Sequence, residues 1–331
     1  MSNSILLLRL GASLLLSTSL LGLSARGQQP PAPRDTSFTV HSAFMYARKS
    51  HPAISIARPA MPATVQASYN LTYCTLGARR LQLDIFYPKA TRRKKYPAVL
   101  LIHGGGWRSG DRSQHVPMAQ QLAARGYVTV TAEYRLSPEA LYPAAVNDLK
   151  AAIRWLRANA GQYPLDTSKI AVWGFSAGGQ LAALVGTTNG DKQLEGSQCH
   201  TSHSSSVQAI VDVDGVLAFI HPESREGDDR KSLSAGTQWF GASTAEKPQL
   251  WQQASSLHHV TAHTPPIAFI NSAVPHMHAG RDDMAKQLAA FHIYYEVHAL
   301  PDTPHTFPLF HPWFVPTLNY TAAFLDKVFK H

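Results

Sequence analysis

The sequence predicts an α/β fold, a mostly parallel, doubly wound sheet of about eight strands. Short apolar runs of strand length alternate along the chain with segments whose apolar residues recur at helical spacing. This alternation is typical of parallel strands joined by right-handed crossover helices. The composition is that of a globular protein, because 44% of the 331 residues are hydrophobic and only 15% are charged. That balance excludes a disordered chain.

The N-terminal region is expected to lie outside this fold. Residues 1–27 contain Arg9, a thirteen-residue stretch of apolar and hydroxyl residues, and small residues at 25 and 27. This pattern is typical of a cleaved export signal, and the apolar stretch is too short to span a bilayer. The sequence therefore predicts a secreted or periplasmic protein with no membrane contact after cleavage, and an uncleaved anchor is the alternative. Residues 28–66 are expected to form an arm without a regular pattern.

The main domain is expected over residues 67–331, and its elements follow in order. Alternating apolar and polar residues predict a β-hairpin at 67–74 and 81–87. Continuous apolar runs predict strands buried on both faces at 98–103, 127–132, 170–173, 207–213, 266–271 and 293–299. Helical spacing predicts helices at 118–125, 143–160, 178–186, 284–291 and 318–329. In the second of these helices, Asp148 and Lys150 are expected on the exposed face.

Residues 217–264 interrupt this alternation. The segment is rich in Trp, Pro, Ser and charged residues, and it lies between two predicted strands. We expect a small cap-like insertion over the carboxyl edge of the sheet, where open α/β folds bind their ligands.

The net charge of +9 is scattered along the chain. Its densest run, at 92–95, is expected to be a solvated loop, because a nucleic-acid site needs charge gathered over a face. We therefore expect no nucleic-acid partner, although an acidic polysaccharide stays open. Cys74 and Cys199 are compatible with one disulfide in an oxidising compartment, but their positions do not decide whether they meet. We expect no metal and no cofactor, because the histidine pairs lack matching ligands at metal spacing.

Ser176 is the predicted nucleophile. It is the centre of a G-x-S-x-G motif, residues 174–178, between a predicted strand and a predicted helix. A serine on such a sharp turn projects its Oγ above the sheet, and small neighbours are needed where the backbone crowds itself. The alternative is a turn that merely packs the helix on the sheet.

A second motif, His-Gly-Gly-Gly-Trp at 103–107, follows the strand at 98–103. Glycines allow backbone N–H groups to approach a tetrahedral oxyanion, so Gly105, Gly106 and Ala177 are the expected donors. A phosphate-binding loop is less consistent, because the Lys-Ser/Thr ending is missing. The general base is expected on the loop after the last strand, where His305 lies.

These motifs resemble those of serine esterases of the α/β-hydrolase superfamily. The resemblance rests on HGGGW, on the stretch at 134–156, on GFSAGG at 174–179 and on PH-x-F at 304–307. It covers roughly residues 67–330 and is strongest to hormone-sensitive-lipase-like and feruloyl/acetyl-xylan-esterase-like bacterial carbohydrate esterases. It implies the α/β-hydrolase fold and a Ser-His-Asp acyl-enzyme mechanism. The expected substrates are acetyl esters of xylan or pectin, with feruloyl esters, pectin methyl esters or small and lipid esters as alternatives.

The acid of the triad departs from the family pattern. Such esterases place it after the strand that corresponds to 266–271, where this chain has Pro275. Asp214 is the favoured replacement, because a carboxylate at the end of the strand at 207–213 can reach the same histidine. Asp283 is the alternative, although helix capping would also explain its position. Without a working acid the chain would be a non-catalytic carbohydrate-binding relative.

Three residues are candidates for substrate binding. Trp107 and Trp313 are aromatic residues near the motif loops, where they would either stack on sugar rings or close the core. Arg281 follows His276 and His278 on the loop where the acid is missing. Cations there would meet uronate carboxylates if the substrate is pectin.

Overall fold

The computed structural model describes residues 35–89 and 94–330, together with Met1. The expected export signal at 1–27 and the basic residues Arg92 and Arg93 lie outside the described residues. Within the described ranges, no helix is long and apolar enough to cross a membrane. Nor do three or more His, Cys, Asp or Glu side chains of these ranges group as metal ligands would.

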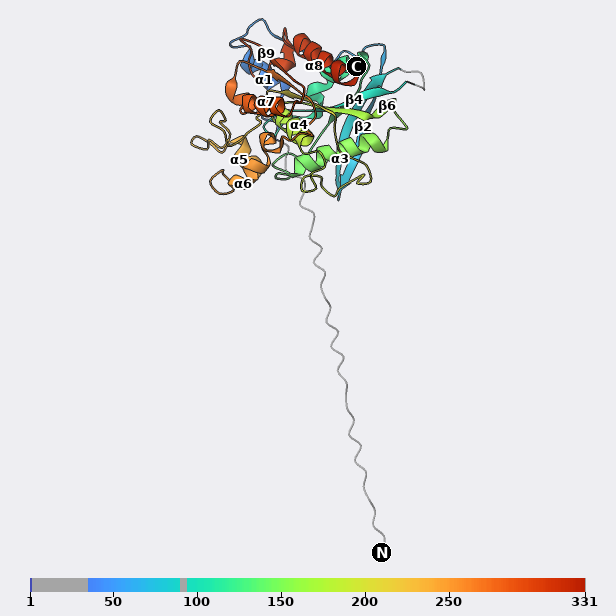
Figure 1. The fold of residues 1–331 in the computed structure, drawn as a ribbon, viewed down its shortest axis with the longest axis vertical. Coiled ribbons are helices and arrows are strands. Elements are labelled where there is room, and N and C mark those ends of the chain that lie inside the picture. The colour runs from blue at the N-terminus through green and yellow to red at the C-terminus, as the bar shows by residue number, and fades with distance from the viewer. Residues whose placement is uncertain (2–34, 90–93, 331) are drawn as a thin grey trace. The chain divides into compact units, whose positions relative to one another are not determined.

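An eight-stranded sheet runs through the described chain in the order β2-β3-β5-β4-β6-β7-β8-β9 (Figure 1). The pairs β2–β3 and β3–β5 are antiparallel, and all other neighbours are parallel. The strands are β2 Val65–Leu76, β3 Arg79–Pro88, β4 Tyr96–Ile102, β5 Val128–Ala132, β6 Leu165–Phe175, β7 Ala209–Val213, β8 Ile267–Asn271 and β9 Tyr295–Ala299. The predicted hairpin and the mostly parallel sheet are confirmed.

Helices cover both faces of this sheet because its central strands are apolar on both sides. In β4, Ala98, Leu100 and Ile102 belong to one core cluster, whereas Val99 and Leu101 belong to the other. The first cluster includes residues of α3 Ala144–Ala158, α4 Ala177–Thr187 and α7 Arg281–Ala290. The second includes residues of α1 Val40–Ala47, α2 Val116–Ala124 and α8 Phe314–Phe329. The doubly wound arrangement is therefore the predicted one.

The arm before the sheet is more regular than the sequence suggests. Thr39 and Ser42 form a capping box at the start of α1, and the buried residues of this helix are Ala43 and Ala47. A short strand, β1 Ser55–Ile56, pairs with β10 Phe310–His311 near the other end of the chain. An eight-residue helix with a face of alanines gives no strong periodicity, and this is why the sequence did not predict α1.

The expected exposure of Asp148 and Lys150 on α3 is wrong. Both residues are buried. Asp148 accepts a bidentate pair of hydrogen bonds from Arg135, at 2.7 and 2.9 Å. The Lys150 Nζ donates to Glu195 Oε1 at 2.9 Å and to the Thr188 carbonyl at 2.6 Å. The segment after α4 covers this helix, so the outer face of α3 is enclosed as well, and both charges are paired as burial requires.

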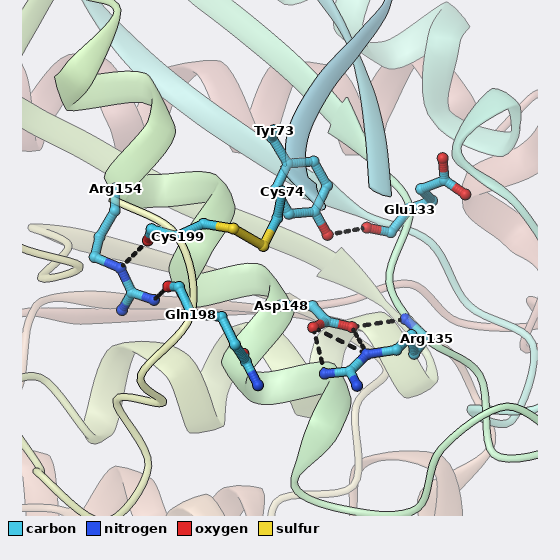
Figure 2. The surroundings of a disulfide bond; sticks show 8 residues. All are labelled: Tyr73, Cys74, Glu133, Arg135, Asp148, Arg154, Gln198 and Cys199. Carbon is cyan, nitrogen blue, oxygen red and sulfur yellow. Dashed lines mark hydrogen bonds and ion pairs between the residues drawn. A yellow bond between two sulfur atoms is a disulfide. The ribbon is translucent and has the colours of Figure 1, made fainter. Parts of the chain in front are cut away.

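A disulfide fastens this covering segment to the sheet. Cys74 of β2 is bonded to Cys199, with 5.6 Å between their Cα atoms. Figure 2 shows the Arg154 guanidinium beneath it, donating to the Cys199 carbonyl at 3.0 Å and to the Gln198 carbonyl at 2.6 Å. The question that the sequence left open is therefore answered, because the two cysteines meet and lock an edge strand to the cover of α3.

Lys94 and Lys95, the described residues of the basic run at 92–95, directly precede β4. The carboxyl ends of helices lie nearby. The Lys95 Nζ donates to the carbonyl of Ala160, two residues after α3 ends, at 3.3 Å. Lys169 likewise donates to the Phe329 carbonyl at the end of α8, at 2.6 Å. Helix C-termini have unpaired carbonyls and a negative partial charge, so cations stabilise them.

Candidate active site

Ser176 lies at the sharp turn between β6 and α4. Its backbone is strained, with φ of 57° and ψ of −123°. The turn is so tight that a Cβ on Gly174 would lie 1.8 Å from the Gly178 carbonyl oxygen. A Cβ on Gly178 would lie 2.2 Å from the Ile102 carbonyl oxygen. Glycine is therefore required on both sides of the serine, as the motif predicted.

Three predicted residues meet above the carboxyl ends of neighbouring strands. The His305 Nε2 lies 2.8 Å from the Ser176 Oγ, and its Nδ1 lies 3.0 Å from the Asp214 Oδ2. Both ring nitrogens are thus engaged, which assigns Nδ1–H as donor to the carboxylate and Nε2 as acceptor from the serine hydroxyl. The carboxylate that the structure brings to His305 is that of Asp214, directly after β7, and not one from the loop after β8.

Asp214 is held in a polar pocket inside the protein. Its side chain has no exposed surface and its φ is 53°. Its Oδ1 accepts the backbone N–H of Ser272 at 2.8 Å and lies 3.2 Å from the His278 Nδ1. Burial alone would raise the pKa of Asp214, but the hydrogen bonds from His278 and His305 outweigh it and lower the pKa to about 2. The group is therefore a carboxylate at neutral pH.

Asp283, the alternative acid, belongs to a different cluster. It lies in the first turn of α7, where its carboxylate binds His221 at 3.2 Å and Lys286 at 2.9 Å. Its side chain is about half exposed, and Lys286 and then His221 lower its pKa. The structure does not bring Asp283 to His305, and we correct that alternative.

The expected oxyanion donors belong to the loop after β4 and to the start of α4, both of which adjoin Ser176. Gly105 and Gly106 have φ values of 128° and 58° in the loop after β4, and Ala177 is the first residue of α4. Within the described residues, none of these three N–H groups donates a hydrogen bond. The amino end of α4 adds positive partial charge beside Ala177.

Trp107 lies inside the protein and is not a surface platform. It is only 3% exposed, and its Nε1 donates to the Gln180 Oε1 at 3.0 Å. Its ring stacks on Trp239 at 4.9 Å between centroids. Of the two roles expected for this tryptophan, sugar stacking is therefore wrong and closing the core is confirmed.

Arg281 and Trp313 are also engaged in the framework. The Arg281 guanidinium binds Asp282 at 2.7 Å and donates to the Asn271 Oδ1 at 3.1 Å. The Trp313 ring stands edge-on to His51 of the arm, at 5.3 Å. Within the described residues neither side chain contacts Ser176, His305 or Asp214, and a role of Arg281 and Trp313 in substrate binding stays a prediction.

The insertion approaches the site from the side of the oxyanion loop. It contains the short helices α5 Ala235–Phe240 and α6 Pro248–Gln253 (Figure 1). The rings of Phe240 in α5 and Trp251 in α6 pack together, with 4.3 Å between their centroids. A Cβ on Gly106 would lie 3.0 Å from the Ala235 Cβ, so α5 begins against this loop. The Glu226 Oε2 accepts the Gly236 N–H at 3.0 Å, and burial raises its pKa.

His278 is the site residue that sequence reasoning missed. The sequence suggests a cation that meets uronate carboxylates, whereas the structure places the His278 Nδ1 3.2 Å from the Asp214 Oδ1. The one available signal was its position, since it lies on the loop where related esterases place their acid. His276 lies in the same short turn, Pro275–His278, and burial followed by the charges of Arg225 and His305 lowers its pKa.

Comparison with known proteins agrees with this geometry. Residues 83–277, more than half of the chain, match the BD-FAE family model. Esterase LipC of Mycobacterium tuberculosis is 31% identical over 194 residues, 58% of this chain and 47% of that protein. The chain thus spans about half the length of the curated relatives it matches over the longest stretches.

Two solved structures illustrate the likeness in fold. A truncated carbohydrate esterase from gut microbiota has a TM-score of 0.68 at 25% identity, covering 81% of this chain and 99% of its own. Esterase 2 of Thermogutta terrifontis, phosphoramylated by tabun, has a TM-score of 0.66 at 26% identity, covering 82% of this chain and 97% of its own. The predicted α/β-hydrolase fold and the resemblance to carbohydrate esterases are confirmed.

Proposed function

The chain belongs to the BD-FAE family and has the α/β-hydrolase fold, and from that premise we propose that it is a serine esterase. In this proposal Ser176 is the nucleophile, His305 the general base and Asp214 the acid. The main support is the unbroken hydrogen-bonded series from the Ser176 Oγ through the imidazole to a fully buried carboxylate. The related proteins named above are esterases, which agrees with this reaction.

The geometry suits a two-step acyl transfer. His305 Nε2 takes the proton of Ser176 as Oγ attacks the ester carbonyl, and the same proton then goes to the leaving alkoxide. The N–H groups of Gly105, Gly106 and Ala177 hold the oxyanion, and such donors are worth roughly 3 kcal/mol each. Water then attacks the acyl-enzyme with His305 as base, releasing the acid and the serine. Asp214 stays ionised and stabilises the imidazolium.

Acetyl esters on xylan or pectin are the substrates we propose. The likeness to a carbohydrate esterase supports a polysaccharide substrate. Buried rings of Trp107, Phe219 and Trp239 pack together beside the oxyanion loop, which favours a small acyl group. The export signal expected at 1–27 suits a polymer outside the cell, so the proposal includes a secreted or periplasmic location.

The test compares the wild-type protein with Ser176→Ala. We expect the wild type to release acetate from acetylated xylan or pectin, and the variant to lose at least about 10⁴-fold in kcat because its nucleophile is gone. A fluorophosphonate should label Ser176 of the wild type. The choice of an organophosphorus probe is supported by the Thermogutta enzyme, whose structure is phosphoramylated by tabun.

Other outcomes separate the alternatives. Release of ferulate or methanol in place of acetate would change the acyl group or the alcohol but keep the mechanism. Labelling of Ser176 without release from any polymer would leave an esterase of small or lipid esters. Neither labelling nor release would favour a non-catalytic carbohydrate-binding relative.

A further inference from the structure

The triad acid has two imidazole partners. His305 binds one oxygen of Asp214, with Nδ1 and Oδ2 3.0 Å apart. His278 binds the other, with Nδ1 and Oδ1 3.2 Å apart, and the Ser272 N–H shares this second oxygen at 2.8 Å. The reaction as described needs only the first of these histidines.

The backbone around His278 is firmly held. The residue ends a 3₁₀ turn, Pro275–His278, and is only 8% exposed. The carbonyl of the next residue, Ala279, accepts the N–H groups of Leu217 and Ala218 at 2.9 and 3.1 Å. Gly280, which follows Ala279, donates its N–H to the Glu223 Oε2 at 3.1 Å. The imidazole is therefore presented to Asp214 by a fixed loop and not by a mobile one.

We propose that His278 is a positioning residue of the triad, which fixes the rotation of the Asp214 carboxylate and takes a share of its negative charge. A carboxylate rotates easily about its last side-chain bond, because that torsion has broad minima. Donors on both oxygens leave a single orientation, in which Oδ2 points to His305. The inference rests on the proposed function, since only an esterase makes use of that orientation.

The shared charge has a consequence for pH dependence. A hydrogen bond strengthens as the charge on its acceptor grows. When two imidazoles bind one carboxylate, each receives less of its charge than a single partner would. Without His278, Asp214 would hold the protonated form of His305 more strongly, and the base would stay protonated, and so inactive, to higher pH.

Other charged groups face these histidines and must be considered. Glu226 of the insertion and His276 of the same turn face His305. Arg225 faces His276. On the strand side, Asp212 is next to Asp214, and burial followed by the charge of Asp214 raises the pKa of Asp212 well above its usual range.

Two further charged side chains lie near the start of α7, just after His278 in the chain. Arg281 follows closely in the chain and faces Asp212, and Glu223 accepts from Gly280. None of these side chains changes in a His278 variant. A change in the pH profile of such a variant therefore reports the imidazole itself.

The experiment measures kcat and KM for p-nitrophenyl acetate against pH in four proteins. His278→Leu removes the donor, and His278→Asn keeps one, since its amide nitrogen corresponds to Nδ1 without a titrating ring. The matched control is His221→Leu, which removes a histidine bound to Asp283 at the same 3.2 Å but away from the triad. The fourth protein is the wild type.

We expect His278→Leu to lose about tenfold in kcat with KM almost unchanged, the worth of about one net hydrogen bond. The acid limb of its pH profile should move to higher pH. His278→Asn and His221→Leu should keep both the kcat and the limb of the wild type. Fluorophosphonate titration counts intact active sites in each protein, so a partly unfolded preparation is not mistaken for a slower enzyme.

Several results would overturn the proposal. One is a His278→Leu variant with the kcat and acid limb of the wild type, and another is an Asn variant as impaired as the Leu variant. If the Leu variant does not fold, His278→Gln replaces it, because its amide corresponds to Nε2 and not to Nδ1. The Gln variant should then show the loss and the shift, and wild-type behaviour would reject the inference. A wild type with no hydrolysis at all would instead reject the proposed function.

Discussion

Two aspartates of this chain each bind a histidine, and their surroundings differ sharply. Asp214 lies 3.0 Å from His305 and Asp283 lies 3.2 Å from His221, so the two contacts are alike in length. The Asp214 side chain has no exposed surface, whereas 48% of the Asp283 side chain is exposed. The pairing of residue types therefore does not distinguish a triad acid from a surface ion pair. Burial does.

The position in the fold explains this difference in burial. β7 has β6 and β8 on its two sides, so a residue at its carboxyl end is enclosed by neighbouring strands and their loops. Asp283 instead lies in the first turn of a peripheral helix, where a carboxylate stabilises the helix end and stays in water. An ion pair away from water interacts more strongly than one in water, because the effective dielectric constant is lower.

The largest expected effect comes from exchanging the two acids for amides. Asp214→Asn should lower kcat by about 10⁴-fold, because the amide no longer stabilises the imidazolium and favours the wrong tautomer of His305. Asp283→Asn should change kcat by less than about twofold, as is usual for exposed ion pairs. Steady-state kinetics at neutral pH measure both. Equal losses in the two variants would contradict the comparison.

A smaller effect is expected from a contact that stabilises the protein without taking part in the chemistry. The Cys74–Cys199 bond closes a loop between residues 125 positions apart and fastens the edge strand β2. Replacing both cysteines by serine should lower the free energy of unfolding by roughly 2–4 kcal/mol. Urea unfolding would measure this loss. Since β2 is distant in strand order from β6 and β7, kcat of the folded variant should match the wild type, and a large fall in kcat would contradict that separation.

The smallest effect is a pH dependence of stability that only the buried acid should show clearly. The pKa of Asp214 is lowered from 3.8 to about 2, so its contribution is present above about pH 4 and is lost as pH falls through about 2. The shift corresponds to about 2 kcal/mol. We therefore expect the free energies of unfolding of the wild type and of Asp214→Asn, measured in urea from about pH 5 down to about pH 2, to converge toward the acid end.

The matched measurement uses Asp283→Asn over the same pH range. The pKa of Asp283 is lowered as well, but water screens the exposed pair, so its difference from the wild type should change little with pH. If the difference in free energy of unfolding between Asp214→Asn and the wild type stayed constant with pH, the contrast between the buried and the exposed acid would be contradicted.

Local motifs predicted one part of the site because their geometry is local. The turn at Ser176 needs only a strand, two close glycines and a helix, and all of them lie within a few residues. The loop with Gly105 and Gly106 is defined in the same way by the strand before it. His305 followed from its place after the last strand, and the structure places it against Ser176.

Long-range packing decided what the sequence left open or missed. The choice of Asp214 depends on the alignment of β7 beside β6 and β8, which no short segment contains. The burial of Lys150 depends on a cover formed by residues far along the chain. Charged residues on a helix usually face water, so only the covering segment could reveal the exception.

The sequence by itself determined the alternation of the eight sheet strands with α2, α3, α4, α7 and α8, together with the turn at Ser176, the glycine loop after β4 and the place of His305. These follow from backbone geometry and hydrophobic periodicity within single segments. Only the tertiary structure decided which aspartate meets that histidine, that His278 shares it, that Trp107 lies in the core and that the two cysteines bond. Each of these depends on distance and burial between segments remote in sequence, and both arise only when the sheet and its covering segments pack together.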